Sequence, residues 1–411
     1  MINHWGGGVW SLLGFSMQMA LVLVLGTAMA NAPIVQKILK KLASIPKTPF
    51  QSIVFVTFIS TLACWLNWGF GLVVGAIFAK EIAKQVKNVD YRLLIASAYS
   101  GFVVWHAGLS GSIPLKVATW SDALAKETGE VITSADQIIS TSRTIFSPWN
   151  LLICLAILIL MPVVNALMHP SKDQVIVIDP KLLVETKPEA PERSTPAQKL
   201  ENSRIMSFIV VILGAIYIVK VFAAKGINGL DLDLVNLIFL VLGVLCHKTP
   251  IAYVKAINEA VKGAGGVLLQ FPFYAGIMGM MTGANAATGA SLAGVISEGF
   301  VAISTKVTFP LWTFLSAGVV NFFVPSGGGQ WTVQGPIMMP AGQALGVDPA
   351  ITAMGIAWGD AWTNMLQPFW ALPALGIAGL GARDIMGYCI IDLLLSGLVI
   401  IIGFLLVGII L

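Results

Sequence analysis

Apolar runs of about 20 residues recur along the whole chain, and polar or glycine-rich stretches separate them. Runs of this length can cross a bilayer as helices, so the pattern predicts an all-α polytopic membrane protein. Two sets of elements are expected in the same order: an apolar helix, an amphipathic segment, an apolar hairpin interrupted by glycine, a long interrupted helix and a closing helix. Their expected ranges are 9–30, 33–47, 50–87, 91–119 and 145–168 in the first set, and 264–283, 287–304, 308–341, 349–377 and 385–410 in the second.

The two sets share a weak internal similarity at a fixed spacing. An Ala-Asn-Ala triplet ends the first apolar run of each set, at 30–32 and at 284–286, and the same offset of 254 places Asn67 on Asn321. Repetition of this kind is typical of transporters built from structural repeats. The expected parts are a first inverted repeat at 1–168, a flexible cytoplasmic loop at 169–203, two connecting spans with a cytoplasmic segment at 204–262, and a second inverted repeat at 263–411.

The distribution of basic residues orients these repeats. Lys and Arg flank both ends of the first hairpin, whereas none occurs from Val307 to Ala382 around the second hairpin. Because cytoplasmic loops are enriched in Lys and Arg, the first hairpin is expected to enter and leave the membrane from the cytoplasm, and the second from the outside. Both hairpins are then re-entrant, the second repeat has inverted topology, and eight full spans leave both termini outside.

Composition adds three exclusions to this picture. Hydrophobic residues make up 57% of the chain and charged residues 11%, against about 25% charged in soluble domains. The net charge of +4 is small and segregated into loops, so no nucleic-acid partner is expected. Four single cysteines predict neither a disulfide framework nor a metal site. Thr27–Ala32 resembles a cleavage site, but no Lys or Arg precedes Lys37, so we expect this first apolar run to be retained as a span.

Four interruptions of the apolar helices are expected. Two are hairpin tips, at Asn67–Gly71 and Asn321–Gln330, and two are breaks within the long helices, at His106–Pro114 and Asp360–Pro368. Non-helical backbone at membrane depth survives only where it is buried in protein or lines a polar cavity. Each repeat is therefore predicted to hold a re-entrant helical hairpin and a discontinuous transmembrane helix, and these parts are expected to meet near the midplane, where substrate and ions bind.

The residues at these interruptions suit a small organic acid. Ser112 is expected to cap a restarting helix with Pro114 in its first turn, and the N–H groups of a helix start favour a carboxylate. No Lys or Arg lies within the four stretches, so we expect no fixed cation to hold the substrate, which favours a monocarboxylate. Trp most often anchors a membrane interface, but Trp68, Trp331 and Trp362 are expected to line a short alkyl chain. The predicted substrate-binding residues are Asn67, Trp68, Gly69, His106, Ser110, Ser112, Asn321, Ser326, Gly327, Gly328, Gly329, Gln330, Trp331, Trp362, Thr363, Asn364 and Gln367.

Ionisable groups within apolar segments are the candidates for ion coupling. Asp360 in an apolar helix costs roughly 2.5–3.5 kcal/mol on insertion scales, so a functional role is expected, with a helix–helix hydrogen bond as the alternative. His106 is open to three roles, as proton relay, donor to a carboxylate or structural cap. The glycines at 327–329 are also compatible with a plain tight turn. The predicted coupling-ion residues are Asn67, Asn321, Asp360 and His106, with Na⁺ or H⁺ as the ion, Na⁺ lying near the hairpin tips, and no other cofactor.

Several motifs resemble those of the short-chain fatty acid transporter family. The most specific is NFFVPSGGGQWTVQGP at 321–336, and the others are NWGFGL at 67–72, WHAGLSGSIPL at 105–115 and AWTNMLQPFW at 361–370. The resemblance covers nearly the whole chain. It implies uptake of short-chain carboxylates such as acetate, butyrate or acetoacetate by cation symport.

The family is similar to a broader ion-transporter superfamily that includes the divalent-anion/sodium symporters. That similarity implies a homodimer working by an elevator mechanism, with the arms at 33–47 and 287–304 framing a mobile transport domain. The sodium symporters carry Ser-Asn-Thr triplets at both hairpin tips, and neither tip here does, so sodium and proton coupling both stay open.

The sequence also bears on two other functional classes. No H-E-x-x-H, G-x-S-x-G or P-loop sequence occurs, so neither an enzyme nor a nucleotide-driven pump is expected. The alternative function is a cation/proton exchanger that uses Asp360 and His106 without an organic substrate. In either case the expected location is a bacterial-type inner (plasma) membrane, with the lipid bilayer as the main partner.

Overall fold

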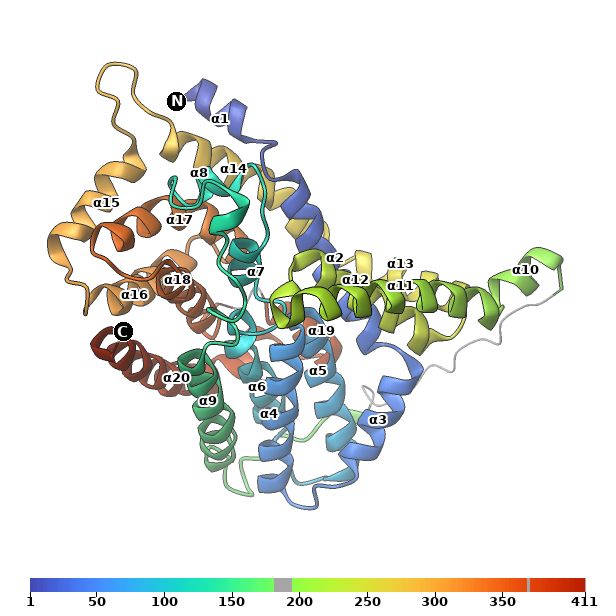
Figure 1. Cartoon of the computed structure of the whole chain (residues 1–411). Helices are drawn as coiled ribbons and strands as arrows, with labels where there is room; N and C mark the ends of the chain where they lie inside the picture. The colour runs from blue at the N-terminus through green and yellow to red at the C-terminus, as the bar shows by residue number, and fades with distance from the viewer. Residues whose placement is uncertain (181–193, 368–369, 411) are drawn as a thin grey trace.

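The computed structural model describes residues 1–180, 194–367 and 370–410, and every regular element in these ranges is a helix (Figure 1). The first part of the chain follows the expected element order, with an additional short helix at the N-terminus. The elements of this first part are α1 Ile2–Gly8, α2 Leu13–Ala30, α3 Pro33–Ala43, α4 Pro49–Leu66, α5 Trp68–Gln85, α6 Tyr91–Ser100, the 3-10 helix η1 Gly101–Ala107, α7 Ser112–Ala118, α8 Leu124–Glu127, η2 Ala135–Gln137 and α9 Pro148–Leu167.

The second part repeats the same succession of helix, arm, hairpin, interrupted helix and closing helix. In the described part of the connection, four helices join the two parts, and the sequence pattern did not predict two of them, α10 and α13. The connecting helices are α10 Pro196–Glu201, α11 Arg204–Lys225, α12 Leu232–His247 and α13 Pro250–Val261, with a 3-10 turn η4 Gly226–Gly229. The second set comprises α14 Gly265–Thr282, α15 Leu292–Ile303, α16 Phe309–Asn321, α17 Gly327–Ala344, α18 Pro349–Thr363, α19 Leu372–Ala378 and α20 Ala382–Ile410.

The two interrupted helices begin in the same way. Asp90 caps α6, because its Oδ1 accepts a hydrogen bond from Leu93 N at 2.9 Å. Asp348 caps α18, because its Oδ1 accepts from Ala350 N at 2.7 Å. A side-chain oxygen at this position satisfies an N–H group that has no partner within the helix. Each capping Asp follows a valine, Val89 or Val347, so the two Val-Asp pairs mark equivalent helix starts.

The two hairpins occupy different parts of the molecule. In Figure 1, α4 and α5 extend toward the lower end of the view, whereas α16 and α17 lie in its upper left part. Between them runs the segment Tyr91–Ala118, where 94% of the residues in an 18-residue apolar stretch are buried. In the peripheral span Arg204–Gly229 the corresponding share is only 6%. The interrupted helix α6–η1–α7 is therefore the centre of the fold, and α11 presents its apolar surface outward.

Three local predictions were wrong. The cap of α7 is Gly111 and not Ser112, which is instead the first helical residue. Asp360 lies inside α18, and the second break begins only after Thr363. Residues 119–147, for which no element was expected, fold into an ordered connection that includes α8 and η2. Pro368, the expected end of the second break, lies outside the described residues.

Six helical segments in the described ranges are long and apolar enough to cross a bilayer. They are Leu13–Ala30, Pro49–Leu66, Tyr91–Ala118, Pro148–Leu167, Arg204–Gly229 and Ala382–Ile410, and Leu232–His247 is a shorter apolar helix.

Candidate functional site

The first hairpin tip consists of one residue, which joins α4 to α5. Asn67 caps α5, with its Oδ1 accepting from Phe70 N at 2.8 Å. The next residue, Trp68, donates its backbone N–H to Ser110 Oγ at 2.9 Å. This bond fixes the first tip to the first helix break. Gly69 lies against the main chain of α2, where a Cβ would approach Leu23 Cα to 3.0 Å, so it contributes close helix packing.

The second hairpin tip leads into the first turn of α17. Ser326 caps this helix, with Oγ 3.4 Å from Gly329 N. The three glycines are therefore helical and do not form a tight turn. Each contacts a different neighbour: a Cβ on Gly327 would come to 2.6 Å from Ser112 Oγ, one on Gly328 to 2.5 Å from Phe15 Cε1, and one on Gly329 against the ring of Tyr274. The main chain of α17 thus packs directly on α7, α2 and α14.

The hydrogen bonds of His106 fix its tautomer. Ile113 N donates to His106 Nε2 at 3.0 Å, and Ser112 Oγ lies 2.9 Å from the same nitrogen. A backbone N–H can only donate, so Nε2 accepts and the ring proton lies on Nδ1. Nδ1 is 2.9 Å from Asp360 Oδ2 and donates to it. Both side chains are buried, at 0% and 1% exposure.

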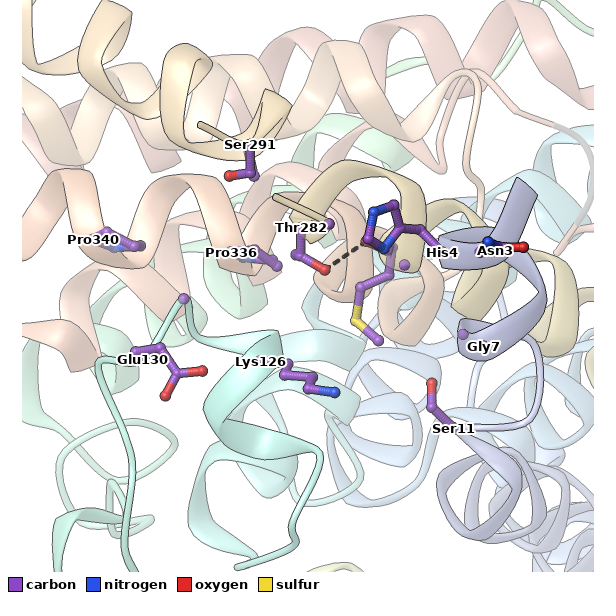
Figure 2. Close-up of a pocket in the computed structure, with 16 residues that line it drawn as sticks. Asn3, His4, Gly7, Ser11, Lys126, Glu130, Thr282, Ser291, Pro336 and Pro340 are labelled. Carbon is purple, nitrogen blue, oxygen red and sulfur yellow. Dashed lines mark hydrogen bonds between the residues drawn. The ribbon is translucent and has the colours of Figure 1, made fainter. Parts of the chain in front are cut away.

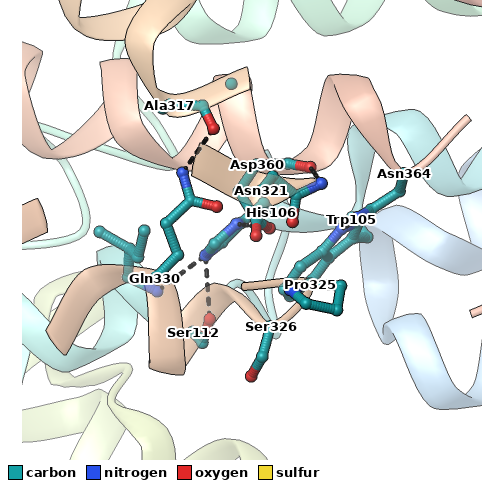
Figure 3. Close-up of polar contacts among 12 residues, drawn as sticks. Trp105, His106, Ser112, Ala317, Asn321, Pro325, Ser326, Gln330, Asp360 and Asn364 are labelled. Carbon is teal, nitrogen blue, oxygen red and sulfur yellow. Dashed lines mark hydrogen bonds and ion pairs between the residues drawn. The ribbon is translucent and has the colours of Figure 1, made fainter. Parts of the chain in front are cut away.

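Three side-chain oxygens around this pair accept no hydrogen bond from the described residues: Asp360 Oδ1, Asn321 Oδ1 and Gln330 Oε1. The amide nitrogens of the Asn321 and Gln330 side chains both have partners: Asn321 Nδ2 donates to Asp360 O at 2.9 Å, and Gln330 Nε2 donates to Ala317 O at 2.8 Å. Figure 3 shows the Gln330 side chain reaching Ala317 and the Asn321 side chain reaching the main chain of Asp360. Buried polar groups normally have partners, so a group of free acceptor oxygens is the arrangement expected where a proton or a cation binds.

A second set of buried atoms offers unpartnered donors. Asn67 Nδ2, Trp68 Nε1 and Asn364 Nδ2 donate to nothing in the described ranges. Asn364 is held by Trp105, whose Nε1 donates to its Oδ1 at 3.0 Å. Trp105 also stacks on His106, with ring centroids 4.0 Å apart, and contacts the edge of Trp68 at 5.9 Å. This aromatic row connects the first tip to the His106–Asp360 pair.

The remaining polar residues of the second break support the tip. Thr363 Oγ1 accepts from Asn321 Nδ2 at 2.9 Å and lies 3.0 Å from Gly318 O, to which it donates. Gln367 Nε2 donates to Asn321 O at 3.4 Å. Trp370 Nε1 donates to Pro325 O at 3.0 Å. Residues from both tips and both breaks thus lie in one buried region.

Two predicted residues point away from this region. Trp362 donates its Nε1 to Leu393 O of α20 at 2.8 Å and packs on Phe314 at 4.9 Å. Trp331 donates to Glu127 Oε2 of α8 at 3.3 Å. Spacing along a helix could not show that these rings lie on other faces of α18 and α17 than the residues that contact His106.

A family profile and two relatives of high sequence identity indicate the same family. A profile of the short chain fatty acid transporter family matches residues 1–407. A protein of Escherichia coli (strain K12), named as a candidate short-chain fatty acid transporter, is 47% identical over 406 residues, which cover 98% of this chain and 89% of that protein. The chain belongs to the short-chain fatty acid transporter family. A relative of the same name from Haemophilus influenzae is 46% identical over the same shares of both chains.

A solved structure of low sequence identity shares the fold. The crystal structure of the Alcanivorax borkumensis YdaH transporter, described as having an unusual topology, aligns with a TM-score of 0.62 at 17% identity, over 99% of this chain and 86% of that one. At this identity the likeness concerns the fold alone. Together with its apolar helices, membership of the short-chain fatty acid transporter family makes the chain a multi-pass membrane protein.

One charged pair in this family member was not foreseen from the sequence. Lys116 lies two residues beyond the first predicted break and is buried, at 5% exposure. Its Nζ is 3.2 Å from Oε1 of the fully buried Glu127. Burial raises the pKa of the Glu127 carboxyl, while the Lys116 ammonium and the Trp331 N–H oppose this shift. The position of Lys116 one helical turn after Ser112 was a usable signal, because residues four apart share a helix face.

Proposed function

We propose that this chain is a secondary transporter that carries short-chain monocarboxylates across the membrane together with a cation. Its family membership supports the substrate class. The single observation that supports coupling is the buried His106–Asp360 pair, with Nδ1 and Oδ2 2.9 Å apart, beside three acceptor oxygens that have no partner in the described residues.

The proposed cation site consists of Asp360 Oδ1, Asn321 Oδ1 and Gln330 Oε1. His106 does not take up a second proton in this arrangement, because its Nε2 already accepts the N–H of Ile113. Asp360 Oδ1 is therefore the atom that accepts a coupling proton, and the three oxygens together suit a hard cation such as Na⁺. His106 positions the carboxylate by donating from Nδ1.

The proposed anion site is the N-terminal turn of α17. The first N–H groups of a helix have no partner within it, and the dipole there favours negative charge. Ser326 to Gln330 form this turn, next to the cation site on the side of Gly327. Asn67, Trp68, Ser110 and Asn364 are the polar residues of the first tip and the breaks that would complete the site.

The larger-scale features belong to the same proposal. The repeated element order supports two inverted repeats with re-entrant hairpins, over 1–168 and 263–411. The arms α3 and α15, which precede the hairpins, would frame a mobile domain in an elevator-type homodimer of the inner membrane. Light scattering of the purified protein and cross-linking between α3 and α5 would test assembly and movement.

Uptake of radiolabelled butyrate into proteoliposomes tests the function. We expect accumulation with an inward sodium or proton gradient, little accumulation without either gradient, and loss of gradient-driven accumulation in Asp360→Asn. Equal uptake with and without gradients would contradict coupling. Cation flux driven by a pH gradient without any carboxylate would instead support the exchanger that uses Asp360 and His106.

A further inference from the structure

Lys116 is the only Lys or Arg that is buried among the residues the structure describes. Its Nζ lies 3.2 Å from Glu127 Oε1, 3.4 Å from Ser121 Oγ and 4.6 Å from the centre of the Phe15 ring. Removing two charges from water costs several kcal/mol per ion, and well-packed apolar side chains often replace such a pair without loss of stability. Stability alone therefore does not explain why this position holds a lysine.

The pair lies beside the N-terminal half of α17. Phe15, which lies under the ammonium of Lys116, is also the ring that Gly328 packs on. Glu127 accepts from Trp331 Nε1 at 3.3 Å, and a Cβ on Gly335 would meet the Glu127 carbonyl oxygen. Gly327, by contrast, contacts His106 and Ser112. The start of α17 thus lies between the cation site on one side and Lys116 on the other.

An open cavity has Lys126, the residue before Glu127, in its wall (Figure 2). It has a volume of about 660 Å³, within the range of about 300–1,000 Å³ typical of ligand sites. Its walls include Ser11, Lys126, Met278 and Pro336. Lys126 precedes Glu127 and Pro336 follows Gly335 in the chain. Ser11 and Met278 lie four residues from Phe15 and Tyr274, the rings that pack on the start of α17. Lys116 and Glu127 themselves are buried, at 5% and 0% exposure, behind this wall.

We propose that Lys116 binds the carboxylate of the transported acid, and that Glu127 takes the place of that carboxylate when no substrate is bound. This inference rests on the proposed function and adds a fixed cation to the anion site at α17. The exchange keeps one carboxylate on the ammonium at all times, so no bare buried charge is formed. Lys126 and Gly129, on either side of Glu127 in the chain, line the cavity. In this proposal the displaced Glu127 side chain turns toward that cavity. Phe15 and Phe271 beside Gly328 provide an apolar surface for a short alkyl chain.

The test separates a binding role from a structural one. The double variant Lys116→Met/Glu127→Leu removes both charges without leaving either unpaired. We expect it to purify as a monodisperse folded protein, to lose the rise in melting temperature that butyrate gives the wild type, and to take up butyrate at least about tenfold more slowly, which corresponds to about 1.4 kcal/mol. Butyramide, which lacks the charge, is expected to shift neither protein.

Matched variants complete the experiment. Lys262→Met/Glu259→Leu removes an exposed pair of the same residue types, 2.6 Å apart, and is expected to behave as wild type. Lys116→Gln/Glu127→Gln retains hydrogen bonding and serves if the apolar pair does not fold; it too is expected to lose the butyrate shift. Butyrate binding and uptake within twofold of wild type in either folded double variant would overturn the role of Lys116. Absence of butyrate uptake by the wild type would instead overturn the proposed function.

Discussion

His106 and Asp360, which are 254 positions apart in the chain, meet as a hydrogen-bonded pair at the centre of the molecule, with Nδ1 2.9 Å from Oδ2. One residue belongs to the break of the first interrupted helix and the other to the last turn before the break of the second. Their contact joins the two halves of the fold at the point where two helices lose regular hydrogen bonding.

Asp360→Asn is expected to abolish gradient-driven butyrate uptake while the protein still folds. The amide oxygen of the variant still accepts from His106 Nδ1, but the hydrogen bond to a charged acceptor is lost. Such a bond contributes about 1.5–3 kcal/mol, which corresponds to a change of roughly tenfold or more in an equilibrium constant. The measurement compares initial uptake rates and melting temperatures. Asp392→Asn is the matched control, because Asp392 is also buried but neither of its oxygens has a partner in the described residues. Its melting temperature should stay the same or rise.

His106→Gln is expected to lower stability more than Ser112→Ala. The first variant removes the acceptor for Ile113 N as well as the donor to Asp360, and leaving buried groups unsatisfied costs about 1–3 kcal/mol. The second leaves the Ile113 bond in place and removes one hydroxyl contact. Thermal unfolding in detergent ranks the two. The reverse ranking would show that Nε2 does not accept from the backbone and would overturn the tautomer assigned here.

Gly327→Ala is expected to impair both folding and transport. Its Cβ would lie 2.6 Å from Ser112 Oγ and 2.7 Å from the Trp105 ring, and overpacking of this kind typically costs about 1–3 kcal/mol. Gly376→Ala in α19 is the control, because its added Cβ would meet no neighbouring atom within 4 Å. This variant should be as stable as the wild type or more stable by up to about 1 kcal/mol. Equal melting temperatures for the two variants would mean that α17 is not packed on α7 as described.

Asn321→Ala is expected to abolish uptake with a moderate loss of stability. Its Nδ2 donates to Asp360 O and to Thr363 Oγ1, both at 2.9 Å, so the tip would lose its attachment to α18 at a cost of about 1–3 kcal/mol. Asn31→Ala is a suitable control, because this exposed amide bonds only to Thr27 O of its own helix in the described structure. Normal uptake by a folded Asn321→Ala protein would remove this residue from the site.

The sequence pattern predicted the succession of helices better than their ends. Runs of apolar residues are long and periodic, so the hairpins at 50–87 and 308–341 were located to within a few residues of α4–α5 and α16–α17. Helix ends depend on which competing group satisfies the backbone. Ser112 was predicted as a cap, but its hydroxyl bonds to His106 and Gly111 takes the cap position.

The candidate site was predicted in part for the same physical reason. Polar residues at interruptions could be listed from the sequence, but the direction of each side chain is set by tertiary packing. Trp362 contacts α20 and Trp331 contacts α8, although both lie next to residues of the polar region. Lys116 was excluded because it lies just beyond the first break, and its burial depends on Phe15 and Glu127, which no local pattern connects to it.

Gly327 to Gly329, the first three residues of α17, have no side chains, and this determines what surrounds them. Ring atoms of Phe15 and Tyr274 rest directly on their main chain, so a change in either ring acts on the peptide groups at the tip as a mutation of the tip itself would. Because these glycines have no side chains, displacement of α17 along the rings would require no rotamer change at the three positions. A fluorine label on Tyr274 would therefore sense displacement of the hairpin from a distant part of the sequence.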